Sequence, residues 1–188
     1  MADFAIHTAE NHPDAAADII AKVKGKYGFV PNLIGALAEA PEAAEAYLAL
    51  GDALQRSAFT PTERHVVWFT INAFHACHYC MAAHTAIAKK DGVADDVIET
   101  ARTSGDYADP KLQALKVFTL EVVRERGWVK PERVDAFLNA GFSRRHVFDV
   151  LLAISHKVLS NYTNHLAKTP VDTPFQPFTW APSAQAAE

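Results

Sequence analysis

The prolines and glycines of this chain are placed like the starts and ends of helices. Proline suits the first turn of a helix, where its missing N–H would have no partner, and glycine suits the position just past the end. Apolar residues between Pro110 and Gly127 recur with a helical period, and no convincing strand-like alternation occurs. The sequence therefore predicts an all-α fold. The expected helical segments are 13–28, 31 onward, 41 onward, 61 onward, 78–92, 94–105, 110–127, 131–141 and 143–168.

Length and charge exclude several classes of protein. The chain has 188 residues, close to one domain of roughly 150 residues. Its 18 Lys and Arg against 22 Asp and Glu give a net charge of −4, which argues against nucleic acid and anionic membranes as partners. No apolar run reaches the roughly 18 residues that cross a bilayer, and residues 1–10 lack the pattern of a signal peptide. We expect a soluble, cytoplasmic protein.

The chain divides into a predicted helical domain and a short tail. Residues 1–168 are expected to form a single all-helical domain, in which 60–92 carries the redox motif described below. The capping-box pattern Thr60-Pro61-Thr62-Glu63 opens that motif. Residues 169–188 hold four prolines, two phenylalanines and Trp180. This tail should be irregular, and its aromatic residues suggest that it lies on a neighbouring surface; the alternative is a disordered tail.

A weak internal repeat is visible when the chain is shifted by 81 residues on itself. The shift aligns Arg64-His65-Val66 with Arg145-His146-Val147, His75 with His156, and His84 with His165. This pattern indicates a duplicated helical unit, with coincidence as the alternative. Only the first copy carries cysteines.

The two cysteines carry the most informative chemistry. Cys77 and Cys80 form a Cys-x-x-Cys pair at the start of an expected helix, where unpaired N–H groups and the helix dipole favour a thiolate. Residues three apart lie on adjacent turns, so the pair can cycle between dithiol and disulfide. His84 follows Cys80 by one turn and could take the proton of its thiol. The sequence thus supplies a nucleophile, a resolving thiol and a base.

Other interpretations of these residues remain open. A Cys-x-x-Cys pair can be half of a zinc site, which His84 and another histidine would complete. His84 alone could be a hydrogen-bonded core histidine, and solvated or capping roles suit His75 and His78. The aromatic residues Trp68, Phe69, Phe74 and Tyr79 suit a core or the wall of a pocket. The polar cluster on the last helix either lines the site or faces water; its members are Asn161, Tyr162, Asn164 and His165.

The motif region resembles the AhpD-like alkylhydroperoxidases of the carboxymuconolactone decarboxylase superfamily. The resemblance rests on residues 62–67 (TERHVV), Asn72 and residues 77–84 (CHYCMAAH), and the helical pattern fits over about 30–168. It implies an all-α fold with a duplicated helical unit and assembly into trimers or hexamers. It also implies that Cys80 attacks a hydroperoxide, that Cys77 resolves the sulfenic acid, and that His84 belongs to a proton relay.

The sequence departs from this family at two positions. Well-studied members carry a relay glutamate at the position of His65 and a histidine at the position of Tyr79. Glu63 cannot simply replace that glutamate, because two residues along a helix turn a side chain by about 200°. His65, Tyr79, Glu63 and His165 are therefore candidates for a relay or pocket rather than for the reacting groups.

The function predicted from these residues is that of a thiol-dependent peroxidase, a redox enzyme with a hydroperoxide substrate and an external dithiol as reductant. No Gly-x-Gly-x-x-Gly motif occurs, so we expect no flavin, haem or nicotinamide cofactor. The first alternative is a redox sensor or thiol–disulfide exchange protein without peroxidase turnover. The second is a lyase of the decarboxylase type that uses His65 and His84 as acid and base.

Overall fold

The computed structural model describes residues 4–181 and confirms the all-α prediction, since no strand occurs within this range. Most predicted segments coincide with an observed helix to within a few residues. In chain order the elements are the short 3-10 helix η1 (Asp14–Ala16), α1 (Ala17–Tyr27), α2 (Asn32–Leu37), α3 (Pro41–Gln55), α4 (Pro61–Phe74), α5 (His78–Lys90), α6 (Asp95–Arg102), α7 (Pro110–Arg124), α8 (Pro131–Asn139), α9 (Arg144–Ala167) and the 3-10 helix η2 (Thr173–Phe178).

Local sequence explains where the central helices begin. The side chain of Thr60 accepts the backbone N–H of Glu63, and the Glu63 carboxylate accepts the N–H of Thr60, so the predicted capping box opens α4. The Asp109 carboxylate accepts two N–H groups of the first turn of α7, directly before Pro110. These caps satisfy N–H groups that have no partner within their helices.

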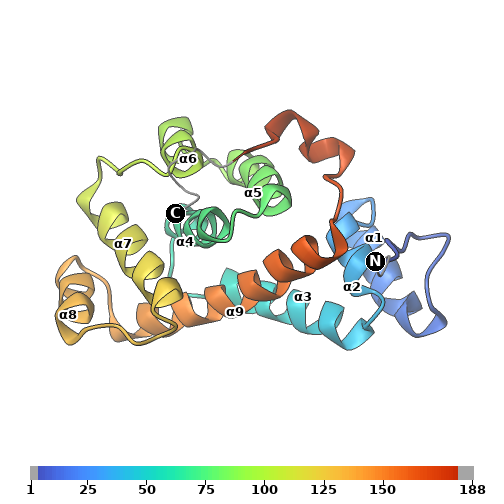
Figure 1. The fold of residues 1–188 in the computed structure, drawn as a ribbon, viewed down its shortest axis with the longest axis horizontal. Helices are drawn as coiled ribbons and strands as arrows, with labels where there is room; N and C mark the ends of the chain where they lie inside the picture. The colour runs from blue at the N-terminus through green and yellow to red at the C-terminus, as the bar shows by residue number, and fades with distance from the viewer. Residues whose placement is uncertain (1–3, 182–188) are drawn as a thin grey trace.

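The helices form two hydrophobic clusters that meet at the motif (Figure 1). The helices α4 and α5 lie at the centre, and α9 runs the length of the molecule beside them, with α7 and α8 at one end and α1–α3 at the other. One cluster joins α4 to α6–α9, while the other joins α1–α3 to the start of α5. Both cysteines belong to the second cluster.

The described part of the C-terminal segment packs against α5. Trp180 Nε1 donates to the Arg102 carbonyl at 2.7 Å, and the Arg102 guanidinium donates to the carbonyls of Phe178 and Thr179. The ring of His78 lies 2.8 Å from the Trp180 carbonyl oxygen. The segment contains the short helix η2, whereas residues 182–188 of the predicted tail lie outside the described range.

The segments paired by the shift of 81 residues differ in form. Residues 61–90 form two helices separated by a turn, whereas α9 is uninterrupted. His65 and His84 are buried, while His165 is exposed. No helix among the described residues is long and apolar enough to cross a membrane.

Candidate active site

A tight turn between α4 and α5 sets the position of the two cysteines. The N–H of Cys77 donates to the Asn72 carbonyl, and the N–H of Ala76 donates to the Ala73 carbonyl, which is the Schellman pattern of a helix end. Ala76 adopts a left-handed φ of 50°, a conformation that favours glycine. Cys77 is then the N-cap residue of α5, and Cys80 lies in the first turn, as the sequence predicts.

One polar face of α9 lies against the sulfur atoms. Asn164 Nδ2 lies 3.3 Å from Cys80 Sγ and 3.8 Å from Cys77 Sγ, so a single amide contacts both cysteines. Ser160 Oγ is 3.8 Å from Cys80 Sγ. Asn161 Nδ2 donates to the Asn72 side chain at 3.0 Å, which ties this face to α4. The Asn164 amide and the Ser160 hydroxyl thus add polar contacts from α9 to those that the start of α5 offers the sulfurs.

These neighbours give the two thiols opposite acidities. Burial opposes ionisation of Cys80, but hydrogen bonds from Cys77, Ser160 and Asn161 and the charge of Lys157 outweigh it and lower its pKa to about 5. The hydrogen bond that Cys77 makes to Cys80, together with burial, raises the pKa of Cys77 well above its ordinary value. Both are free thiols. The geometry therefore favours a Cys80 thiolate beside a protonated Cys77.

His84 contacts a lysine rather than the thiol that its spacing suggests. Lys157 Nζ lies 2.9 Å from His84 Nε2, and the Lys157 side chain is completely buried. Burial, the charge of Lys157 and the neighbouring histidines hold the pKa of His84 well below its usual range. A neutral ring that accepts the lysine proton at Nε2 carries its own proton at Nδ1, which has no partner among the described residues.

His65, at the position of the family glutamate, binds the carboxylate of the residue that follows α5. Its Nε2 lies 2.8 Å from Asp91 Oδ2, and its ring centroid is 6.2 Å from that of His84. Burial, opposed by Asp91, lowers the pKa of His65. Trp68 packs beside both histidines, with centroid distances of 5.2 Å to His65 and 4.8 Å to His84. The histidines therefore form a chain of rings leading away from the cysteines, not a direct contact with sulfur.

Two of the candidate relay residues have structural partners elsewhere. The Tyr79 hydroxyl donates to Asp172 Oδ2 at 2.5 Å, so it fastens the C-terminal segment instead of facing the sulfurs. The Glu63 carboxylate caps α4 and pairs with Lys111 Nζ at 2.7 Å. Glu63 is held at the first turn of α4, and the rotation between positions 63 and 65 separates it from the side of His65, as expected.

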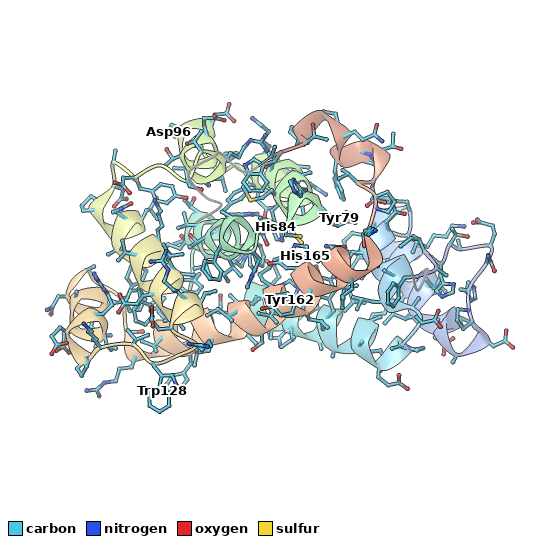
Figure 2. The ribbon with its side chains drawn as sticks, in the orientation of Figure 1. Tyr79, His84, Asp96, Trp128, Tyr162 and His165 are labelled. Atoms are coloured by element: carbon cyan, nitrogen blue, oxygen red, sulfur yellow. The ribbon has the colours of Figure 1, made fainter. Side chains whose placement is uncertain are left out.

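His165 lies at the surface rather than in the pocket for which it was a candidate. It is exposed, and its ring stacks on Tyr162 with centroids 6.5 Å apart. Tyr162 in turn packs edge-on against His75. Figure 2 shows Tyr162 and His165 on α9 and His84 on α5. The predicted polar cluster is therefore divided, because Asn161 and Asn164 face the cysteines while these two rings do not.

Lys157 and Ser160 are site residues that the sequence interpretation missed. Together with Asn161 and Asn164 they occupy positions 157, 160, 161 and 164, which is the spacing of one helical face. That run of polar residues at core spacing was the available signal. Because buried lysines are rare, the sequence alone favours a solvated side chain for Lys157, and only the packing shows that it is buried.

The zinc interpretation finds no ligand set in residues 4–181. No group of three or more His, Cys, Asp or Glu side chains in that range could hold a metal ion. The reason is geometric, because His84 turns toward Lys157 and both His75 and His78 contact other groups.

Comparisons with known proteins agree with this fold. The model of the carboxymuconolactone decarboxylase family matches residues 41–119, and no curated protein matches the chain in sequence. The AhpD core of an uncharacterized peroxidase-related protein from Ralstonia eutropha JMP134 is 25% identical, with a TM-score of 0.75, and the match covers 97% of this chain and 100% of that one. A peroxidase-related protein from Silicibacter sp. TM1040 is 19% identical, with a TM-score of 0.74 over 87% of each chain.

A third solved structure carries a different activity in its name. A cysteine-to-alanine variant of the debrominase Bmp8, bound to 2,3,4-tribromopyrrole, is 15% identical, with a TM-score of 0.71 over 88% of this chain and 89% of that one. At this identity the likeness concerns the fold. The family model over residues 41–119, the AhpD core and the Cys-x-x-Cys turn agree with one another, and together they support the AhpD-like carboxymuconolactone decarboxylase superfamily as the family of this chain.

Proposed function

We propose that this chain is a thiol peroxidase that reduces hydroperoxides through Cys80 and Cys77. The observation that carries the proposal is the setting of Cys80, whose sulfur meets Asn164 and Ser160 and feels the charge of a fully buried lysine. A thiolate is the reactive form of cysteine, and a buried cation beside it offsets part of the cost of burying its charge.

The first step consumes one hydroperoxide. The Cys80 thiolate attacks the outer oxygen of ROOH, the O–O bond breaks, and the products are Cys80–SOH and the alkoxide RO⁻. Sulfur is oxidised and the peroxide is reduced. Lys157, which begins as the ammonium partner of the thiolate, gives a proton to RO⁻ and becomes a neutral amine.

The second step closes a disulfide. The sulfur of Cys77 displaces hydroxide from Cys80–SOH, forming the S–S bond, and the proton of Cys77 passes through the Lys157 amine to that hydroxide, which leaves as water. An external dithiol then reduces the disulfide and is itself oxidised. The Asn164 amide, which contacts both sulfurs, supports this exchange by holding the two side chains at the same place.

His84 acts in this scheme by holding the lysine. Its Nε2 accepts a hydrogen bond from Lys157, so the ammonium group stays beside the sulfurs. Because burial keeps the His84 ring neutral, it does not compete with Lys157 for the positive charge.

The test measures the turnover of cumene hydroperoxide, with a dithiol reductant, by the parent protein, Cys80→Ser and Cys77→Ser. Cys80→Ser should abolish turnover, whereas Cys77→Ser should leave a sulfenic acid at Cys80 that dimedone traps and mass spectrometry locates. Ser104→Ala, at an exposed residue after α6 and outside residues 60–92, is the control. Equal turnover in Cys80→Ser and the parent protein would refute the proposal.

A redox sensor is the second candidate, and the burial of the thiols favours it. Cys77 and Cys80 are 1% and 2% exposed, and the second hydrophobic cluster covers them. A sensor oxidises once and turns over slowly. Stopped-flow oxidation separates the two functions, because an enzyme reacts much faster than a free thiol and is regenerated by the dithiol over many cycles.

We also propose that the chain self-associates through an exposed apolar stripe, here called the α9 stripe. Its members recur at helical spacing on α9, with one neighbour at the end of α4, and they are Phe148, Leu151, Tyr162, Leu166 and Phe74. A second copy would bury side chains that otherwise face water on a single helix. Light scattering should show an oligomer that Leu166→Glu dissociates; a monomeric parent protein would contradict this.

A further inference from the structure

Arg64 is a buried cation without a hydrogen-bonding partner. Its side chain leaves the first turn of α4, and the residue is only 6% exposed. Its Nε is buried and unpaired, and no carboxylate of the described residues forms an ion pair with it. A guanidinium group has five N–H donors and no acceptor, and a buried donor without a partner, such as Nε here, destabilises the fold.

A second unpaired donor lies on the next turn of the same helix. The Arg64 guanidinium lies over the Trp68 ring, 5.5 Å from its centroid. The indole N–H of Trp68 is also buried and has no acceptor. Two hydrogen-bond donors thus lie on neighbouring turns of α4, and neither Arg64 Nε nor the Trp68 N–H has an acceptor among residues 4–181.

Among the described residues, Asp91 supplies the carboxylate whose charge acts on Arg64. One of its oxygens, Oδ2, hydrogen bonds to His65 at 2.8 Å rather than to the guanidinium. Lys157, the other buried cation of the region, contacts His84 and acts on the cysteines. Arg64 is therefore the cation that the proposed peroxidase chemistry does not use.

We propose that Arg64 and Trp68 bind the carboxylate group of the hydroperoxide that this site reduces, an inference that rests on the proposed function. A planar guanidinium and a carboxylate match in a two-point hydrogen bond, and a stacked ring holds the guanidinium in one plane. One guanidinium balances one negative charge, which suits a carboxylate better than a doubly charged phosphate ester.

Trp68 contacts Arg64 and also a histidine that lies close to the cysteines in the sequence of α5. Its ring lies 4.8 Å from that of His84, which stands one turn after Cys80 on α5. Trp68 thus contacts Arg64 as well as His84, and the proposed substrate lies along these side chains, between the carboxylate site and the sulfur. The substrate class is an organic hydroperoxide that carries a carboxylate at the end opposite its peroxide group.

Binding is tested without turnover, using the reduced full chain and calorimetry. Benzoate should bind at least about ten-fold more tightly than benzamide, since a hydrogen bond to a charged group is lost in the amide. Arg64→Gln should remove this preference, and Arg64→Lys should retain only part of it, because lysine keeps the charge without the planar pair of donors. Arg144→Gln, at the first residue of α9, is the matched control and should retain the preference. Equal binding of benzoate and benzamide to the parent protein would overturn the inference.

Turnover then distinguishes this inference from the proposed function. The parent protein should show at least about a ten-fold higher kcat/KM for para-carboxylated cumene hydroperoxide than for cumene hydroperoxide, and Arg64→Gln should lower that ratio toward one. If both peroxides are reduced equally well, the carboxylate site is wrong and the peroxidase proposal stands. If neither is reduced while benzoate still binds through Arg64, the peroxidase proposal is wrong and the carboxylate site stands.

Discussion

Lys157 Nζ lies 2.9 Å from Nε2 of His84, and the two residues are 73 positions apart in the chain. This contact joins α9 to α5 in the interior, near enough for the charge of Lys157 to act on both cysteines. The spacing of His84 from Cys80 suggests a base for the thiol, whereas this contact engages the ring with Lys157. In the proposed mechanism the histidine holds Lys157 in place, and the charge of Lys157, rather than the ring, helps to stabilise the Cys80 thiolate.

Replacing Lys157 with methionine should slow the reaction of Cys80. Methionine has a similar length but no charge, so the Cys80 pKa rises above its value of about 5 and less thiolate is present at pH 5. We expect alkylation of Cys80 by iodoacetamide at pH 5 to fall about five-fold for a rise of one pKa unit, since the thiolate fraction drops from about a half to about a tenth. Peptide mass spectrometry measures the rate at Cys80, and Lys90→Met, at the exposed end of α5, is the control. An unchanged rate in Lys157→Met would show that the lysine does not act on the thiol.

The alkylation rate of Cys80 should depend on pH differently from that of an ordinary cysteine. A free thiol has a pKa near 8.5 and reacts slowly at pH 6, whereas the folded protein lowers the pKa of Cys80 to about 5. The rate at Cys80 should therefore be nearly constant from about pH 6 upward and fall below it.

The same shift has a consequence for stability. A depressed pKa stabilises the fold fully above the unfolded value and loses that effect as pH falls toward about 5. The free energy of unfolding of the parent protein relative to Cys80→Ser should therefore increase between about pH 5 and 8.5. Urea denaturation of both proteins measures this difference in the free energy of unfolding, and a difference that does not vary with pH would contradict the lowered pKa.

The helices could be predicted from the sequence because their signals are local. Thr60 and Glu63 cap α4 over four residues, and Pro110 and Pro131 each stand at the first position of a helix. The placement of Cys77 and Cys80 at the start of α5 follows from the same local pattern.

The partners of the site residues could not be predicted, because they come from distant parts of the chain. Asp91 reaches His65 across 26 positions, and Asp172 reaches Tyr79 across 93. No helical period specifies such pairs, since they depend on how α4, α5 and the C-terminal segment pack. Tyr79 and His165 were candidates for the site on spacing and alignment, and packing directs both elsewhere.

The strained turn before Cys77 gives a prediction about stability. Ala76 has a φ of 50°, where a Cβ atom is unfavourable, so Ala76→Gly should raise the free energy of unfolding by about 0.5–1 kcal/mol. Ser104→Gly is the matched control, because Ser104 has a φ of 58° after α6, away from the cysteines. Both substitutions should stabilise the protein in urea denaturation. A loss of stability in Ala76→Gly alone would show that the turn before Cys77 is not left-handed.

The hydrogen bond between Tyr79 and Asp172 should control access to the buried thiols. Asp172 accepts the Tyr79 hydroxyl at 2.5 Å and the Asn32 N–H at 3.0 Å, and it fastens a segment whose Val171 and Phe175 pack on the cluster that contains both cysteines. Asp172→Asn removes the charged acceptor, so we expect a loss of about 1.5–3 kcal/mol in the free energy of unfolding. We also expect faster alkylation of Cys80, because the segment opens more often.

Two further variants separate the hydrogen bond from the loss of charge. Tyr79→Phe removes the same bond from the other side and should also speed the alkylation, while Asp135→Asn, on the exposed face of α8, should change neither stability nor rate. Tyr79→Phe leaves the Asp172 carboxylate in place but also removes the hydroxyl that accepts the Leu33 N–H at 3.3 Å. A faster rate in both variants assigns the effect to the contact whose loss they share, the bond between Tyr79 and Asp172. If both variants lose stability but their alkylation rates match that of the parent protein, the oxidant reaches Cys80 by a route that residues 169–181 do not cover.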